Sequence, residues 1–183
     1  MKYSFREALP GDYEAIRRLN HRTFAEELGQ HGTHPSGLLE DRFESRARYF
    51  LALEGDHVAG MICAMHDRPF SVESRLPDLS VLDAWPAPRV EIRLLALEPE
   101  HRNGLVMAGL IGCMMKAVSA AGARTMLISG ISTRLAMYER MGFAALGPPV
   151  VSGQASYVPM AARVDLLPEN ARRGLDRAQR DIS

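Results

Sequence analysis

The sequence has few of the residues that hold small secreted or metal-dependent proteins together. Only two of its 183 residues are cysteines, Cys63 and Cys113, and both lie in apolar stretches without a CxxC or Cys/His spacing. This excludes a disulfide framework and predicts buried free thiols in a reducing compartment. The six histidines form no HExxH pattern or other ligand spacing. The sequence therefore predicts no metal site.

Long apolar runs and an excess of charge of one sign are also missing. No run approaches the roughly 18 residues needed to cross a bilayer, and the N-terminus has no apolar signal core. Lysine plus arginine and aspartate plus glutamate number 22 each, which gives no reason to expect a nucleic-acid partner. We therefore expect a cytoplasmic protein without a membrane span.

Apolar periodicity predicts a mixed order of strands and helices. The predicted strands are 2–9, a hairpin over 47–67 around Gly55 and Asp56, 89–97, 124–129, 144–147 and 156–166. The predicted helices are 12–29, 104–122 and 132–142, with a short helix or turn in 38–46 and a short helix between loops in 68–88. A hairpin before a strand-helix-strand unit indicates an α+β class, with a mixed, mostly antiparallel sheet flanked by helices. We assign residues 1–167 to one domain and 168–183 to an Arg-rich tail, mobile or serving as a docking element.

The stretch EPEHRNGLVMAGL, residues 98–110, joins an apolar strand to an apolar helix through a tight turn. A strand, a turn containing Arg102-Asn103-Gly104 and a helix N-terminus present backbone N–H groups in an arrangement that binds phosphate. Leu105 and Met107 stand where a phosphate loop normally has two more glycines, and their side chains narrow the room for a diphosphate. The alternative is that the segment is only a turn.

The order of elements, this loop and the segment LAMYERMGF together resemble the GNAT acyltransferase superfamily over about residues 2–166. In that superfamily the loop follows the pattern Arg/Gln-x-x-Gly-x-Gly/Ala, and its amides hold the pyrophosphate of coenzyme A or the phosphate of phosphopantetheine. The resemblance implies a GNAT-like domain and an acyl thioester as co-substrate. The donor-binding positions that it implies are Leu97, Arg102, Asn103, Gly104, Leu105, Val106 and Met107.

Further segments are similar to two groups of the superfamily that use acyl carrier protein, the acyl-homoserine lactone synthases and the long-chain N-acyl amino acid synthases. LNHRTFAEELG matches their first-helix motif through Leu19, Arg22, Phe24 and Gly29. The segment YERMGFAALGPPVVSGQASYVPMAARVDL is most similar to the amino acid synthases. The resemblance implies acyl carrier protein as a partner and a small-molecule amine as acceptor, with Phe24 as a substrate-binding residue.

Two residues are candidates for the chemistry of acyl transfer. Glu91 matches the superfamily glutamate on the strand beside the acyl site, which implies that it deprotonates the amine, directly or through water. Its alternative is a structural ion pair with Arg89 or Arg93, and alternation places Arg93 and Leu95 on the same strand face as Glu91. Tyr138 in MYERMGF matches the tyrosine that can protonate the departing thiolate, although such a tyrosine can also serve packing alone.

Other residues are candidates for substrate binding. The synthases usually carry an arginine three residues after the glutamate, where this chain has Leu94. The nearest arginine, Arg93, could bind the carboxylate of an amino acid or only neutralise Glu91. In the GNAT fold the glutamate strand and the next strand splay apart, which implies that Ser129 lies near the pantetheine arm.

Methionines and basic residues bear on the choice of donor. Six of the ten methionines gather around the implied site, where they could line a tunnel for a fatty chain or simply fill the core: Met107, Met114, Met115, Met126, Met137 and Met141. An acidic carrier protein also needs a basic surface, for which Arg102 and Lys116 are the candidates.

Three functions agree with these features. The favoured one is an N-acyltransferase that moves a long acyl chain from acyl carrier protein to the amine of an amino acid. The second is a coenzyme A-dependent N-acetyltransferase of a small amine or a protein, using acetyl- or another acyl-coenzyme A. The third is a non-catalytic module that binds an acyl group or an acyl carrier, and the presence of Glu91 and Tyr138 argues against it.

Overall fold

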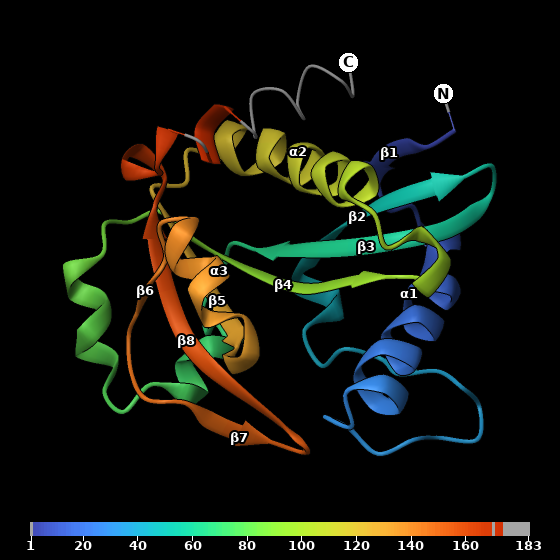
Figure 1. Cartoon of the computed structure of the whole chain (residues 1–183), viewed down its shortest axis with the longest axis horizontal. Helices are drawn as coiled ribbons and strands as arrows, with labels where there is room; N and C mark the ends of the chain where they lie inside the picture. The colour runs from blue at the N-terminus through green and yellow to red at the C-terminus, as the bar shows by residue number, and fades with distance from the viewer. Residues whose placement is uncertain (1, 170, 174–183) are drawn as a thin grey trace.

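A mixed sheet of eight strands runs through the computed structural model, which describes residues 2–169 and 171–173 (Figure 1). The strands follow the order β1-β2-β3-β4-β5-β8-β6, with β7 paired to β8. Only β4 and β5 are parallel, and every other neighbouring pair is antiparallel. This confirms the predicted α+β class. The strands are β1 (Ser4–Glu7), β2 (Ala47–Glu54), β3 (His57–Met65), β4 (Arg89–Leu97), β5 (Thr125–Ile131), β6 (Ala144–Ala145), β7 (Val150–Ser152) and β8 (Ala155–Arg163).

Helices cover both faces of the sheet. α2 (Gly104–Ala120) packs on one face of β1 to β3, and α1 (Tyr13–Asn20) packs on β3 and β4 from the other face (Figure 1). α1 continues as the π-helix η2 (His21–Glu27), and α3 (Leu135–Arg140) packs on β5. The 3-10 turns are η1 (Pro10–Asp12), η3 (Glu44–Arg46), η4 (Ser71–Arg75), η5 (Leu79–Ala84), η6 (Pro99–His101), η7 (Ser132–Arg134) and η8 (Val164–Leu166).

Strand alternation divides the core into layers, because successive side chains point to opposite faces. Phe50 of β2 packs in the layer under α2, whereas its neighbours Tyr49 and Leu51 pack in the layer under α1. The predicted hairpin turns at Gly55, whose φ of 60° suits glycine. The sequence analysis did not predict β7, a strand of three residues that pairs with β8 around Gly153.

β4 and β5 are hydrogen-bonded over a short distance only. Their register covers Arg89–Glu91 against Thr125–Leu127. β4 remains paired with β3 as far as Leu97, and β5 remains paired with β8 as far as Ile131. The two parallel strands therefore separate after Glu91, which is the splay that the family resemblance implies.

A bulge interrupts β4 at the beginning of this opening. Cys63 of β3 lies opposite Arg93 and Met61 lies opposite Ala96, so β4 holds one residue more than its partner there. Leu94 has a φ of 53°, a left-handed conformation that is uncommon for leucine. The extra residue reverses the alternation, so that Leu95 is 41% exposed and Ala96 is buried. The prediction that Leu95 shares the face of Glu91 and Arg93 is therefore wrong, since simple period-2 counting cannot anticipate a bulge.

Other predictions concern the thiols, the tail and the membrane. Cys63 is buried and Cys113 is only half-buried, and neither forms a disulfide.

Most of the predicted tail, residues 170 and 174–183, lies outside the described residues. Ala171 lies against an internal cavity. Within 2–169 and 171–173, no helix has both the length and the hydropathy needed to cross a membrane.

Candidate active site

Two cavities meet in the opening between β4 and β5. One, the apolar cavity, has a volume of about 440 Å³, and the other, the polar cavity, has a volume of about 500 Å³. Both volumes are in the range of small-molecule sites. Six residues line both cavities: Phe24, Ile92, Arg93, Leu94, Ser129 and Tyr157. The predicted substrate residues Phe24, Arg93 and Ser129 thus lie at one junction.

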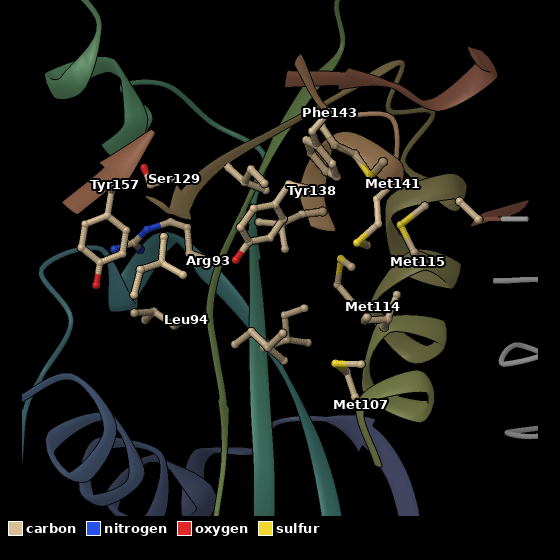
Figure 2. A pocket seen from close by; sticks show the side chains of 18 of the residues that line it. Arg93, Leu94, Met107, Met114, Met115, Ser129, Tyr138, Met141, Phe143 and Tyr157 are labelled. Carbon is tan, nitrogen blue, oxygen red and sulfur yellow. The ribbon is translucent and has the colours of Figure 1, made fainter. Parts of the chain in front are cut away.

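The apolar cavity lies between the sheet opening and α2. Met107, Met114, Met115 and Met141 stand along its wall on the side of α2 and α3 (Figure 2). Met126 of β5 also lines the cavity, whereas Met137, the sixth methionine of the predicted cluster, does not. Unbranched thioethers adapt their shape to an irregular occupant. This cavity is suited to a flexible apolar chain.

Tyr138 of α3 lines the apolar cavity, with its hydroxyl pointing across it toward β4 (Figure 2). Its ring packs edge-on against Phe143 and over Gly130 of β5, where a Cβ would come within 2.8 Å of the ring. Burial raises the pKa of the Tyr138 phenol. A phenol with a raised pKa stays protonated at neutral pH and can donate a proton or a hydrogen bond.

Glu91 lines the polar cavity and is fully buried. Its carboxylate accepts hydrogen bonds from the Ser71 N–H at 2.5 Å, the Ser71 hydroxyl at 2.5 Å and the Val72 N–H at 2.9 Å. Burial raises the pKa of Glu91, and these hydrogen bonds oppose part of that effect. Glu91 therefore joins the cavity to the first residues of η4.

Arg93 forms its ion pair with Asp41, and it acts on Glu91 only through its charge, which opposes part of the rise that burial causes in the pKa of Glu91. Its guanidinium donates to both carboxylate oxygens of Asp41, at 2.6 and 2.9 Å. The Tyr49 hydroxyl donates to the same carboxylate at 3.2 Å, and Arg93 also lies over the Phe43 ring. This bidentate pair uses two of the five guanidinium N–H groups, so the carboxylate of a substrate at Arg93 would compete with Asp41 for the positive charge.

Ser129 stands on β5 where the two cavities join. Its hydroxyl is buried and has no hydrogen-bond partner in the part of the chain that the structure describes. Burying a hydroxyl without a partner costs about 1–3 kcal/mol. Such a group is well placed to bond to a ligand that enters either cavity.

The loop before α2 is only partly open to a phosphate. Asn103 is the N-cap of α2, and its side chain accepts from the Val106 N–H at 3.0 Å. Val106 is buried, and a donor phosphate at its amide would have to displace the Asn103 side chain. The N–H groups of Gly104 and Leu105 have no acceptor among the described residues. Leu105 is 61% exposed and does not line the apolar cavity.

Ion pairs tie this loop to the first helix. Arg102 donates to the Glu27 carboxylate at 2.5 and 2.7 Å and to the Leu97 carbonyl at 3.1 Å. Arg22 of η2 is paired with the buried carboxylate of Glu98. A phosphate at Arg102 must compete with Glu27, and Leu97 contributes its carbonyl to this contact without lining the apolar cavity.

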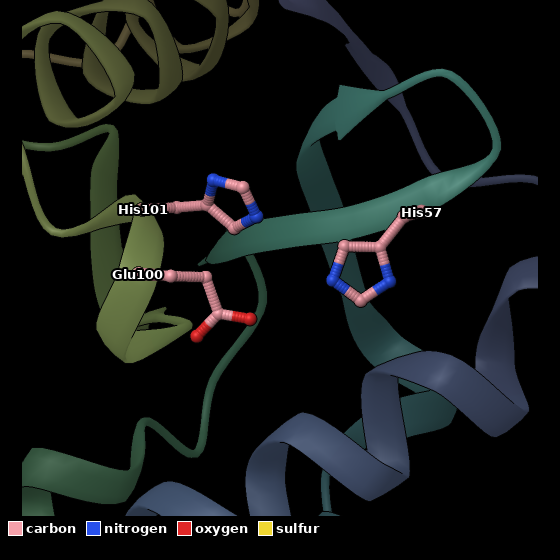
Figure 3. Close-up of side chains that lie close together, drawn as sticks. All are labelled: His57, Glu100 and His101. Carbon is pink, nitrogen blue, oxygen red and sulfur yellow. The ribbon is translucent and has the colours of Figure 1, made fainter.

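A cluster of possible metal ligands lies away from both cavities. Figure 3 shows His57 at the start of β3 beside Glu100 and His101, with ligand atoms within 4.8 Å of one another. His101 also contacts the Tyr3 hydroxyl at 3.0 Å and Glu54 at 3.6 Å. Glu91 of β4 pairs with Met65 at the end of β3, whereas His57 lies at the start of β3. We therefore assign the cluster no part in the candidate active site.

The opening between β4 and β5, with Glu91 at the polar cavity and Tyr138 at the apolar cavity, forms the candidate active site. The sequence profile described as Acetyltransferase (GNAT) family matches residues 13–143, and the chain belongs to this family. No curated protein matches the chain.

Solved structures share the fold at low sequence identity. The coenzyme A-dependent acyl-homoserine lactone synthase BjaI, with SAM and isopentyl-CoA, has a TM-score of 0.73 and 19% identity over 98% of this chain and 89% of its own. FeeM, an N-acyl amino acid synthase from uncultured soil microbes, has a TM-score of 0.72 and 18% identity over 93% and 97%. YncA, a putative acetyltransferase from Salmonella typhimurium with acetyl-CoA, has a TM-score of 0.62 and 16% identity over 91% and 96%. At such identities the likeness shows the fold.

The sequence analysis did not predict three residues of the site. Asp41 binds Arg93, Ser71 binds Glu91, and Arg75 lines the polar cavity. Asp41 lies in the segment 38–46, for which the sequence predicted only a short helix or turn. Ser71 and Arg75 lie in the proline-rich stretch between β3 and β4, where no periodic pattern indicates which side chains turn inward.

Proposed function

We propose that this acyltransferase moves a long acyl chain from the thioester of acyl carrier protein to the amine of an amino acid. The observation that carries the proposal is the junction of the two cavities. An apolar chain fits the methionine-lined side, an amine with polar groups fits the other side, and the thioester carbon comes to lie between them at Ser129. The chemistry needs a base for the amine and a proton donor for the leaving thiolate, and we assign these roles to Glu91 and Tyr138.

The donor loop favours carrier protein over coenzyme A. The Asn103 side chain occupies the Val106 amide, and Glu27 occupies Arg102. Two N–H groups, those of Gly104 and Leu105, suit the single phosphate of phosphopantetheine better than a diphosphate. The second candidate is a coenzyme A-dependent N-acetyltransferase, which is supported by the family name and by the coenzyme A compounds in BjaI and YncA.

Calorimetry with three donors tests the proposal. Palmitoyl-acyl carrier protein, palmitoyl-coenzyme A and acetyl-coenzyme A are titrated into the protein at one salt concentration. We expect the carrier-protein form to bind most tightly and acetyl-coenzyme A most weakly, because the apolar cavity is filled only by the long chain. Tight binding of acetyl-coenzyme A would contradict the proposal and favour the second candidate.

Replacement of Tyr138 by phenylalanine tests its role as proton donor. We expect turnover to fall by about tenfold, a moderate loss because a thiolate of pKa ~8.5 can leave partly without a proton. Tyr13→Phe removes a phenol hydroxyl from α1, outside both cavities, and serves as the control. An unchanged rate for Tyr138→Phe, measured with saturating donor, would reduce Tyr138 to a packing residue.

A further inference from the structure

Arg75 is a cationic side chain in the polar cavity that has no anionic partner. It is half-buried, and no described residue accepts a hydrogen bond or forms an ion pair with its guanidinium. Its contact within the chain is with Tyr157, whose ring centroid lies 5.5 Å from the guanidinium carbon. A half-buried guanidinium without a bonded carboxylate is costly, because burial removes part of its solvation and lowers its pKa, and the charge of Glu91 opposes only part of this effect. An anionic ligand bound at Arg75 would therefore stabilise this part of the polar cavity.

The neighbouring arginines either have a carboxylate partner or are exposed to solvent, unlike Arg75. Arg93 is held by Asp41, and Arg17 donates to Glu44 at 2.5 and 3.0 Å. Arg42 also lines the polar cavity, but it is exposed and lies over the Phe43 ring. Three arginines of the described residues line this cavity. Arg75 is the one that is partly buried and has no hydrogen-bond acceptor or ion-pair partner for its guanidinium among those residues.

The segment that carries Arg75 is anchored at its other end. Arg75 is the last residue of η4, and Ser71 and Val72 at the start of η4 are fixed by three hydrogen bonds to Glu91. The Ser74 hydroxyl donates to the Ser71 carbonyl at 2.8 Å, which holds the turn. A guanidinium on such a short, anchored turn is preorganised and loses little entropy when it binds a ligand.

We propose that Arg75 binds the carboxylate of the acceptor, so that the enzyme selects amines that carry an anionic group, such as amino acids. This assignment rests on the proposed function and gives Arg75 a role that the sequence analysis offered to Arg93 as one of two alternatives. With the carboxylate on Arg75, the amine of the acceptor extends past Glu91 in the same cavity toward Ser129, where the apolar cavity begins. A bidentate pair between guanidinium and carboxylate gives both affinity and orientation.

Kinetics with matched acceptors test the assignment. Glycine and glycinamide differ in the carboxylate and share the amine, and both are compared for the wild type, Arg75→Met and the control Arg18→Met, at an exposed arginine of α1 that lines neither cavity. We expect Arg75→Met to raise KM for glycine about tenfold with little change in kcat, and to leave KM for glycinamide unchanged. Arg75→Lys should restore part of the difference, and Arg18→Met should behave as the wild type. Equal losses with glycine and glycinamide would mean that Arg75 is structural and would overturn the assignment.

Equilibrium binding separates this assignment from the proposed function, because it needs no turnover. N-palmitoylglycine and N-palmitoylglycinamide are titrated into the wild type and Arg75→Met. We expect the wild type to bind the carboxylate form about tenfold more tightly and Arg75→Met to bind both forms alike. Unchanged binding of the amide form also shows that the variant is folded. If the wild type binds both equally, only the role of Arg75 is overturned; if it binds neither, the proposed function fails and the assignment fails with it.

Discussion

Glu91→Gln is expected to lower kcat by about 100-fold at neutral pH, with donor binding almost unchanged, since general bases typically contribute about 10²–10⁴-fold. The amide of glutamine has nearly the size of the carboxylate but cannot take a proton from the amine. It also has one oxygen where the carboxylate uses two to hold Ser71 and Val72. Calorimetry with the donor and steady-state kinetics with the acceptor separate these effects.

The pH profile shows whether Glu91 acts as the base. A base works as the carboxylate, so activity is retained above its pKa and is lost as the pH falls through it. Because burial raises the pKa of Glu91, the acid limb of the wild type should lie above 4.5, the ordinary value, and should disappear in Glu91→Gln. Glu73→Gln, on the same turn but paired with Arg68, is the control. A variant that keeps the acid limb and only raises KM for the acceptor would show that Glu91 positions η4.

Ala108→Trp is expected to lower kcat/KM for a palmitoyl donor by about 100-fold, which corresponds to roughly 3 kcal/mol of overpacking. Ala108 lies on α2 and lines the apolar cavity. An indole at this position takes up volume that the distal part of a long chain needs, whereas a short chain ends before it. A butyryl donor should therefore be used almost as well as by the wild type.

The specificity of this change can be checked on the same helix. Ala120 is exposed at the end of α2, so Ala120→Trp adds the same side chain outside the cavity and should leave both donors unaffected. Rates are measured with palmitoyl and butyryl donors on the same carrier. Equal losses for both donors with Ala108→Trp would show that the apolar cavity does not hold the acyl chain.

The sequence predicted the fold well because its elements carry local signals. The hairpin of β2 and β3, the strand β4 and the helix α2 each show apolar periodicity of the required length. The opening between β4 and β5 also agrees with the family resemblance. The bulge at Leu94 was missed because it depends on the register with β3, which a single strand does not encode.

The site was predicted less completely, since side-chain partners come from distant segments. Glu91 and Tyr138 do line cavities, as their positions in the family motifs suggested. Arg93 instead forms its ion pair with Asp41, which is 52 positions earlier in the chain. No spacing rule connects two such residues. Sequence alone therefore could not show that Arg93 has a carboxylate partner and that Arg75 has none among the described residues.

The separation of β4 from β5 also affects the stability of the protein. Three residue pairs join the two halves of the sheet, and beyond them an apolar cavity takes the place of a continuous backbone ladder. A bound acyl chain would make van der Waals contacts with the side chains that line the apolar cavity. Any ligand that binds the folded form alone shifts the folding equilibrium in its favour by mass action. Under the proposed function, a bound acyl donor would therefore raise the free energy of unfolding of the enzyme as well as serve as its substrate.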